Sequence, residues 1–181
     1  YDYGDNGSRA KTYQPYTWGR FEGEEVEHWQ AKTWTRGERP LYGLDRLAEW
    51  FAKHPEGKVG VAEGEKSADA AAKLLPGYCW VCWPGGADAV RHADFGPLAG
   101  RDVLLWPDAD NDQGGQLSMR KLAAELRITC ESVKFINPDD RTDGWDAADA
   151  VLEGMIYATW GQWAKAHLEW LHPPQDMAEV D

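Results

Sequence analysis

The sequence predicts an α/β fold in which a mainly parallel sheet of about four strands is flanked by helices, with a β-rich extension at the N-terminus. Short apolar runs of strand length alternate along the chain with apolar stripes of helical period, and Gly or Pro stands at most junctions. Such alternation is typical of βαβ units, whose strands pair in parallel. The 181 residues, of which 43% are hydrophobic and 12% aromatic, are enough for one domain with a substantial core.

Residues 1–57 form the predicted N-terminal extension. Two runs rich in aromatic residues and Thr, at 12–18 and 26–34, are typical of β-structure, and the second alternates roughly with a period of two. Pro15 indicates that the first run is an edge strand or a bend. A helical stripe over 44–51 predicts a short helix that completes the extension.

Residues 58–153 form the predicted α/β core. Four apolar runs of strand length are each followed by a turn and by a segment with helical spacing. The expected strands are 58–62, 78–83, 102–106 and 132–136. The expected helices are 68–75, 87–93, 119–126 and 146–152.

Residues 154–181 are expected to form a last helix and a tail. Apolar side chains spread from Ile156 to Leu171, Trp170 among them, and indicate a helix that packs back on the core. The tail from His172 onward is expected to be loose.

The chain is strongly acidic, since 19 Lys and Arg stand against 31 Asp and Glu and give a formal net charge of −12. A protein that holds nucleic acid through its overall charge needs a basic surface. Any nucleic-acid contact is therefore expected to be local, bridged by a metal ion, or supplied by another domain.

No stretch of the sequence approaches about 18 consecutive apolar residues, so we expect no membrane span, and the N-terminus does not resemble a signal peptide. Because the chain does not begin with Met, we expect it to be a piece of a longer protein. Three cysteines are too few for a disulfide framework, which indicates a reduced, cytoplasmic protein. Cys79 and Cys82 lie in one expected strand and are predicted to face the same side as buried small residues.

Acidic residues follow three of the expected strands: Glu63 and Glu65, then Asp108, Asp110 and Asp112, then Asp146 and Asp149. Because ligands of an open α/β sheet bind at the carboxyl ends of its strands, we expect these carboxylates to gather at one rim. Carboxylate oxygens there suit Mg²⁺ or Mn²⁺, which also bind substrate phosphates. Taken alone, residues 108–112 equally suit a solvated turn. The combination of a Glu after one strand with Asp-x-Asp after another favours the metal site.

These residues resemble the Toprim domain, which primases, topoisomerases, recombination mediator proteins and some nucleases share. Residues 59–66 are similar to its first motif, an apolar strand ending in Glu-Gly, and residues 103–110 to its second, an apolar strand ending in Asp-x-Asp. Residues 83–89 resemble the Gly-rich turn of primase-type members. Residues 144–150 are similar to a segment of phage and plasmid replication proteins. The resemblance runs over 58–150, roughly half of the chain.

The resemblance implies a Toprim (Rossmann-like) fold with a metal-dependent phosphoryl-transfer site. In such a site Glu63 would be a general acid/base or a metal ligand, and Asp108 and Asp110 would hold Mg²⁺ or Mn²⁺. The acidic loop is one residue longer than is usual in the family. The metal-binding pair is therefore either Asp108/Asp110 or Asp110/Asp112, and the first is favoured because Asp108 follows the strand more closely.

Four further residues are candidates for substrate contacts: Lys66, Gly85, Gly86 and Asp146. Lys66 lies beside the Glu-Gly motif and could meet a nucleotide phosphate, although a solvated helix Lys is the commoner case. Core packing is expected for most of the eleven tryptophans. Trp106 and Trp145, next to the acidic residues, are the two that could stack on a base.

The function predicted first is the catalytic core of a DNA primase from a phage, prophage or plasmid, which makes RNA primers from nucleotides on single-stranded DNA. It would act with further domains or a helicase. Two alternatives stay open: a Toprim nuclease that cleaves DNA, and a non-catalytic module that binds nucleic acid or a partner. The chain departs from the primase pattern, because it has no matched Cys-x-x-Cys pairs for a zinc domain and residues 1–57 are not strongly basic. A core is therefore expected, not a complete primase.

Overall fold

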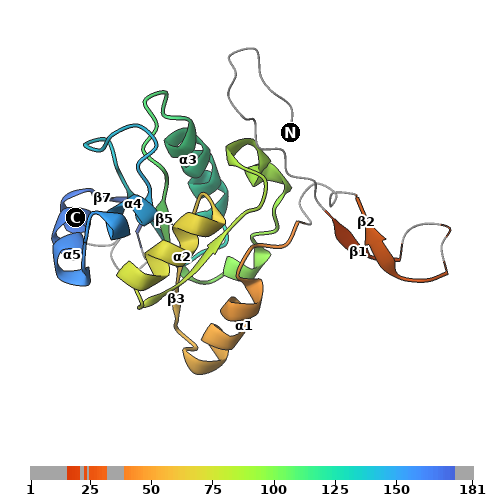
Figure 1. The fold of residues 1–181 in the computed structure, drawn as a ribbon. Coiled ribbons are helices and arrows are strands. Elements are labelled where there is room, and N and C mark those ends of the chain that lie inside the picture. The colour runs from red at the N-terminus through yellow and green to blue at the C-terminus, as the bar shows by residue number, and fades with distance from the viewer. Residues whose placement is uncertain (1–15, 21–22, 24, 32–38, 174–181) are drawn as a thin grey trace, which may run out of the picture.

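The computed structural model describes residues 16–20, 23, 25–31 and 39–173. Its main body is a five-stranded sheet with helices on both faces, and a two-stranded hairpin lies apart from it at the N-terminal end (Figure 1). The predicted α/β fold is confirmed, with one strand more than expected. In spatial order the strands are β4 (Tyr78–Cys82), β3 (Lys58–Ala62), β5 (Asp102–Trp106), β6 (Ser132–Ile136) and β7 (Leu168–His172).

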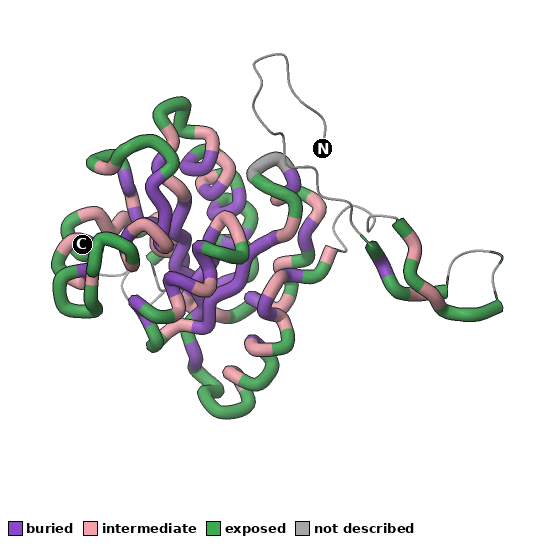
Figure 2. Tube along the Cα trace, in the orientation of Figure 1, coloured by how far each residue is buried: buried purple, intermediate pink, exposed green. Residues whose placement is uncertain are grey.

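Helices cover both faces of the sheet, whose first four strands in this order are parallel while β7 is antiparallel to β6. The helices are α1 (Leu44–Lys53), α2 (Glu65–Leu74), α3 (Gly114–Leu126), α4 (Ala147–Leu152) and α5 (Tyr157–Ala166). Side chains alternate along each strand, so Val61 and Leu105 pack with α1 and α3, whereas Leu104 and Trp106 pack with α2, α4 and α5. Figure 2 shows the buried residues concentrated in the strands between the two helix layers.

The helical stripes predicted from the sequence are the faces that pack inward. Helix α2 buries Ala68, Ala71 and Leu74, spaced three apart, and α3 buries Met119 and Leu122. The helix expected over 87–93 is a 3₁₀ helix, η1 (Ala87–His92), and a second short one, η2 (Gly96–Leu98), follows it.

The C-terminal helix is shorter than predicted. Helix α5 ends at Ala166, and Trp170-Leu171, which were expected in the helix, lie in strand β7. The outer edge of β6 needs main-chain hydrogen-bond partners, and β7 supplies them. Over a few residues, apolar spacing does not distinguish a half-buried strand from the end of a helix. Trp170 packs on Lys134 of β6, whose Nζ lies 4.2 Å from the ring centroid.

The prediction that Cys79 and Cys82 face one side of their strand is wrong. Cys79 packs in the apolar cluster that α1 and α3 cover, and Cys82 packs in the cluster on the opposite face. Positions three apart in a strand point to opposite faces, because side chains alternate with a period of two. Both thiols are buried, and burial raises the pKa of Cys79 and raises that of Cys82 to about 12.

The N-terminal hairpin consists of β1 (Thr17–Gly19) and β2 (His28–Gln30), which are antiparallel. Trp18 faces Trp29 across it, with ring centroids 5.6 Å apart. The rest of the two predicted β runs, at 12–15 and 32–34, lies outside the described residues, as does the tail from residue 174. Among the described helices, none combines the length and the apolar character that crossing a membrane requires.

Close packing of the neighbouring strands β3 and β4 generates a stability prediction. A Cβ added to Gly60 of β3 would overlap the indole of Trp80 on β4, which is fully buried. We expect Gly60→Ala to lower the free energy of unfolding by about 1–3 kcal/mol, because the buried indole, whose Nε1 donates to the carbonyl of Leu75 at 3.2 Å, would have to shift. Urea denaturation measures this. Gly77→Ala is the control, since its Cβ would meet nothing within 4 Å. Equal stability of wild type and Gly60→Ala would contradict the prediction.

Candidate active site

The carboxyl ends of β3 and β5 lie at the kind of position where open α/β sheets bind ligands. The chain passes from β3 through α2 to β4 on one side, and from β5 through α3 to β6 on the other, while β3 and β5 are direct neighbours. The connections therefore diverge at this point. Ala62 pairs with Trp106, so Glu63 and the chain after Trp106 leave the sheet side by side.

Glu63 and Asp110 present carboxylate oxygens to one point. A Cβ at Gly115, in the first turn of α3, would overlap Oε2 of Glu63 and lie 3.1 Å from Oδ2 of Asp110. The N–H of Gly115 donates to Oδ2 of Asp110 at 2.9 Å. Oε2 of Glu63 is buried and has no hydrogen-bond partner among the described residues. A buried acceptor without a partner is costly, so this arrangement suits a cation.

Burial and mutual repulsion raise the pKa of two carboxyls in this cluster. The pKa of Asp108 is raised from 3.8 to about 8 by burial, then by the charges of Glu63, Asp146 and Asp110, while Lys66 opposes the shift. Burial and then the charge of Asp110 also raise the pKa of Glu63, although a backbone hydrogen bond from Asp108 lowers it. More acidic groups therefore gather at the ends of these strands than the nearby positive groups among the described residues neutralise.

Asp112 has a structural role within the acidic loop, residues 108–112. Its side chain accepts the N–H of Gly114 at 3.0 Å, as turn residues before a helix commonly do. Gln113 beside it has φ 59°, the one positive φ among non-glycine residues in the described ranges. These contacts favour Asp108 and Asp110 as the metal-binding pair, which stays a prediction.

A second loop, residues 137–146 between β6 and α4, holds the acidic loop in place. The N–H of Ala109 donates to the carbonyl of Trp145 at 2.8 Å within an isolated antiparallel bridge. The N–H of Asn111 donates to Oδ1 of Asp143 at 2.8 Å. The main chain of the acidic loop is therefore fixed by residues distant in sequence.

The structure brings together Lys66 and Asp146, two of the predicted substrate contacts, at 3.3 Å. Asp146 caps α4, because Oδ1 accepts the N–H groups of Ala148 and Asp149 at 2.7 and 2.9 Å, and Oδ2 accepts the hydroxyl of Ser67 at 2.8 Å. Burial alone would raise the pKa of Asp146, but hydrogen bonds from the Asp149 backbone, Ser67 and Lys66 lower it. These contacts support a structural role for Asp146, which joins α2 to α4.

Gly85 and Gly86 form the turn after β4, at the same edge of the sheet. Their φ angles of 104° and 78° are ones that glycine adopts readily. The carbonyl of Gly86 accepts a hydrogen bond from Nε1 of Trp83 at 2.8 Å, and a Cβ on Gly85 would lie 2.8 Å from a guanidinium nitrogen of Arg39. The backbone therefore accounts for both glycines, and their contact with substrate stays a prediction.

Trp106 and Trp145 are not open for base stacking, since they are 1% and 3% exposed. They belong with Trp160 and Trp163 to an indole cluster in which the ring centroids of Trp106 and Trp160 are 5.1 Å apart. The cluster is part of the core on the α4 and α5 face.

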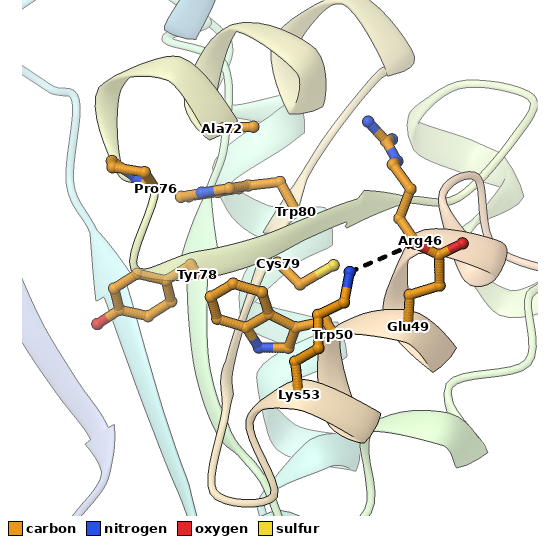
Figure 3. Close-up of a pocket in the computed structure, with 9 residues that line it drawn as sticks. All are labelled: Arg46, Glu49, Trp50, Lys53, Ala72, Pro76, Tyr78, Cys79 and Trp80. Carbon is orange, nitrogen blue, oxygen red and sulfur yellow. Dashed lines mark ion pairs between the residues drawn. The ribbon is translucent and has the colours of Figure 1, made fainter.

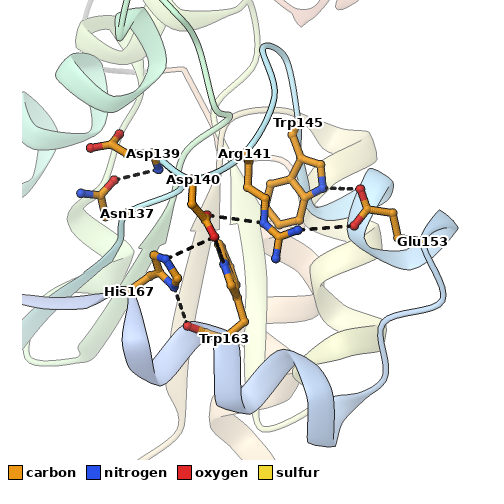
Figure 4. A network of polar contacts seen from close by, with 8 residues as sticks. All are labelled: Asn137, Asp139, Asp140, Arg141, Trp145, Glu153, Trp163 and His167. Atoms are coloured by element: carbon orange, nitrogen blue, oxygen red, sulfur yellow. Dashed lines mark hydrogen bonds and ion pairs between the residues drawn. The ribbon is translucent and has the colours of Figure 1, made fainter.

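Arg141, in the loop between β6 and α4, was not predicted from the sequence to be a functional residue. Its Cζ lies 4.7 Å from the ring centroids of both Trp145 and Trp163, and Figure 4 shows the guanidinium beside them. Asp140 and Glu153 lie 3.5 and 3.7 Å from its nitrogens. The only available signal was its place after the fourth predicted strand, because no sequence spacing links an arginine to indoles from two different elements.

One hollow adjoins the acidic loop, and another lies at the opposite end of the strands. One of about 230 Å³ separates the acidic loop from the β6–α4 loop, and its lining includes Asp110, Asn111, Gln113, Gln116, Asp139 and Arg141. Another of about 300 Å³ is lined by residues of α1, the end of α2 and the start of β4, among them Trp50 and Tyr78 (Figure 3). The second hollow lies at the amino end of β4, away from the carboxylates.

Within the part of the chain that the structure describes, no group of three or more His, Cys, Asp or Glu side chains is spaced to hold a metal ion by itself. The residues nevertheless fit a divalent cation. Oε2 of Glu63 lacks a partner, and Oδ2 of Asp110 faces the same point. Mg²⁺ commonly takes only one or two carboxylates and completes its shell with water and substrate phosphate.

No protein-family model matches the sequence, and no curated protein matches it. Among solved structures, the Aquifex aeolicus primase crystal structure, of the zinc-binding and RNA polymerase domains, matches with a TM-score of 0.52 and 15% identity over 86% of this chain and 37% of that one. The DnaG catalytic core (TM-score 0.48, 20% identity) and the E. coli primase catalytic core (0.47, 21%) each match over 92% of this chain and 53% of theirs. The Aquifex likeness shows a shared fold. The chain spans between 37% and 53% of these solved chains.

The pKa of Asp108 predicts how stability changes with pH when no metal is present. Folded Asp108 keeps its proton up to about pH 8, whereas the unfolded carboxyl loses it near 3.8. The folded state therefore binds more protons between these values, and this contribution to stability is lost as pH rises through that window. We expect Asp108→Asn to stabilise the protein at pH 8 by about 1–3 kcal/mol and to have little effect at pH 4.

Urea denaturation in EDTA at a series of pH values measures this effect. Asp112→Asn is the matched control, because it makes the same change at an exposed carboxyl of the same loop, and we expect it to stabilise the protein less than Asp108→Asn does at pH 8. A variant at position 108 that is less stable than wild type at pH 8 would refute the prediction.

The space at Gly115 predicts an effect on metal binding. We expect Gly115→Ala to weaken the binding of Mn²⁺ and Mg²⁺ by at least about tenfold, because the methyl group would occupy the point that Glu63 and Asp110 face. The rise in melting temperature with ion concentration measures this affinity. Gly161→Ala in α5, where a Cβ meets nothing within 4 Å, should keep the response of wild type. An undiminished response in Gly115→Ala would place the ion elsewhere.

Proposed function

We propose that this chain is the catalytic core of a DNA primase, which joins ribonucleotides into RNA primers on single-stranded DNA. The observation that carries the proposal is the meeting of Glu63, Asp108 and Asp110 at the carboxyl ends of β3 and β5, with Oε2 of Glu63 buried and without a hydrogen-bond partner among the described residues. The fold shared with the Aquifex aeolicus primase structure supports it. The resemblance of residues 59–66 and 103–110 to the Toprim motifs is a second, independent support.

Each carboxylate has a proposed role. Asp108 and Asp110 hold Mg²⁺ or Mn²⁺, and Glu63 is a further ligand or takes the proton of an attacking 3′-hydroxyl. When bound, the ion supplies positive charge to the phosphoryl group being transferred. The raised pKa of Glu63 suits a residue that accepts a proton and returns it during the reaction.

Lys66, Gly85 and Gly86 are proposed to contact substrate from the two neighbouring strand ends. Lys66 follows β3 in the first turn of α2, with 67% of its side chain exposed, so it can reach a nucleotide phosphate while it stays near Asp146. The glycine turn after β4 exposes its main chain at the same sheet edge.

The larger protein is proposed to serve phage, prophage or plasmid replication in the cytoplasm, with further domains or a helicase. The similarity of residues 144–150 to a segment of such replication proteins supports this context. The net charge of −12 agrees with it, because other domains must then supply the basic surface that holds a template.

Primer synthesis on single-stranded DNA tests the proposal. We expect the protein, given labelled ribonucleotides, end-labelled DNA and Mg²⁺ or Mn²⁺, to make short RNA. Asp108→Asn and Glu63→Gln are expected to reduce the yield by at least about 100-fold, since each removes charge or proton transfer at the reacting phosphate. Gel electrophoresis resolves both labels.

Glu125→Gln, which changes an exposed carboxylate on α3, is the control and should leave the yield unchanged. Shortening of the DNA that Asp108→Asn abolishes would instead identify a nuclease. The absence of both products would favour a non-catalytic module. Asp112→Asn decides between the two candidate pairs, because a loss as severe as that of Asp108→Asn would assign the metal to Asp110 and Asp112.

A further inference from the structure

The hollow between the acidic loop and the β6–α4 loop is polar and adjoins the proposed metal point. Its volume of about 230 Å³ can hold a group of several heavy atoms, given about 30 Å³ for one water molecule. Asp110 is shared by the hollow and the proposed metal point, since it lines the hollow and faces Glu63 across the space at Gly115. A ligand in the hollow would therefore lie near an ion bound at Asp110.

Arg141 lines this hollow and has an N–H donor without a hydrogen-bond partner among the described residues. A guanidinium carries five N–H donors, and Nε of Arg141 is buried without a hydrogen-bond partner among the described residues. Its ion pairs with Asp140 and Glu153, at 3.5 and 3.7 Å, are longer than hydrogen bonds. Trp145 and Trp163, whose ring centroids lie 5.2 Å apart, both contact the group, which limits its orientation before any ligand arrives.

The ligand that fits these features is a phosphate group. The planar fork of arginine matches two phosphate oxygens, and the low hydration of a guanidinium favours such partly buried sites. Asp110 and Asp139, which also line the hollow, would repel a free phosphate. An ion on Asp110 would reverse that repulsion, so phosphate binding here is expected to depend on the metal.

We infer that Arg141 binds substrate phosphate, and that the hollow receives the polyphosphate of the incoming nucleotide. The inference rests on the proposed function, because the phosphate is expected to arrive together with the ion that Asp108 and Asp110 hold. Nucleotide polyphosphate is favoured over the DNA backbone because the hollow lies beside the metal point and joins it through Asp110.

Arg141 also fastens the β6–α4 loop, and the test must separate the two roles. If its role were only structural, its replacement would loosen the loop and change stability or the affinity for metal, without a specific effect on phosphate. If it binds phosphate, the affinity for metal stays as in wild type and the affinity for polyphosphate falls.

Calorimetric titration measures both quantities on the whole chain. Mn²⁺ alone is titrated first, and inorganic tripolyphosphate is then titrated at saturating Mn²⁺. We expect Arg141→Gln to lower the affinity for tripolyphosphate by about tenfold or more and Arg141→Lys to lower it less, with unchanged Mn²⁺ binding in both. Arg120→Gln is the matched control. Arg120 lies 4.2 Å from the ring centroid of Phe135 and pairs with Glu169 at 2.7 Å, but it does not line the hollow.

Two further titrations identify the source of the phosphate. If Arg141→Gln lowers the affinity for a nucleoside triphosphate but not for a single-stranded oligonucleotide, the inference is supported. If it lowers the affinity for the oligonucleotide alone, the inference is overturned in favour of the template backbone. If wild type binds no Mn²⁺, the proposed function fails; if it does, and the Arg141 variants bind tripolyphosphate as well as wild type, only this inference fails.

A measurement on wild type keeps the inference testable if the variants do not fold. The Nε–H resonance of Arg141, assigned by its connectivity in NMR spectra, should shift when tripolyphosphate is added in the presence of Mg²⁺. The resonance of Arg120 should stay in place. An unmoved Arg141 resonance at saturating tripolyphosphate would overturn the inference.

Discussion

Repulsion among carboxyls at the ends of β3 and β5 is the constraint on which the rest of the structure depends. Glu63, Asp108 and Asp110 gather where the chain connections diverge, and burial with mutual repulsion raises the pKa of Asp108 to about 8. Such a cluster destabilises a fold unless positive charge and a rigid frame compensate for it. The frame begins with four parallel strands buried on both faces, and the N-terminus of α3 adds the N–H of Gly115 and a favourable dipole at Asp110.

The β6–α4 loop supplies the rest of that frame. Its bridge to Ala109 fixes the acidic loop, and Asp146 at its end ties α4 to α2, the helix that starts two residues after Glu63. The indole cluster anchors both the acidic loop and the β6–α4 loop. Trp106 directly precedes the acidic loop, and Trp145 belongs to the bridge between the two loops. This accounts for four of the tryptophans beside an acidic site without any contact between them and a base.

A site of this kind explains how so acidic a chain could act on nucleic acid. Charge on a phosphate would be met locally, by an ion between carboxylates and by a few oriented cations, and a basic surface would be left to other domains. The polar hollow at Arg141 extends the same principle, because its phosphate affinity would appear only with the ion in place.

The sequence by itself determined the α/β fold, the bounds of the four parallel strands to within a residue, and the gathering of Glu63 with the Asp108–Asp112 loop at one sheet edge. Apolar periodicity and strand–helix alternation can be read from short stretches of sequence. A parallel sheet then places the carboxyl ends of its strands at one edge, independently of the side chains. Only the tertiary structure decided that residues 168–172 close the sheet edge, that Asp146 is engaged in a helix cap and an ion pair, and that Arg141 packs on two indoles. Each of these depends on contacts between residues far apart in the chain, which packing of the helices on the sheet sets and no local spacing encodes.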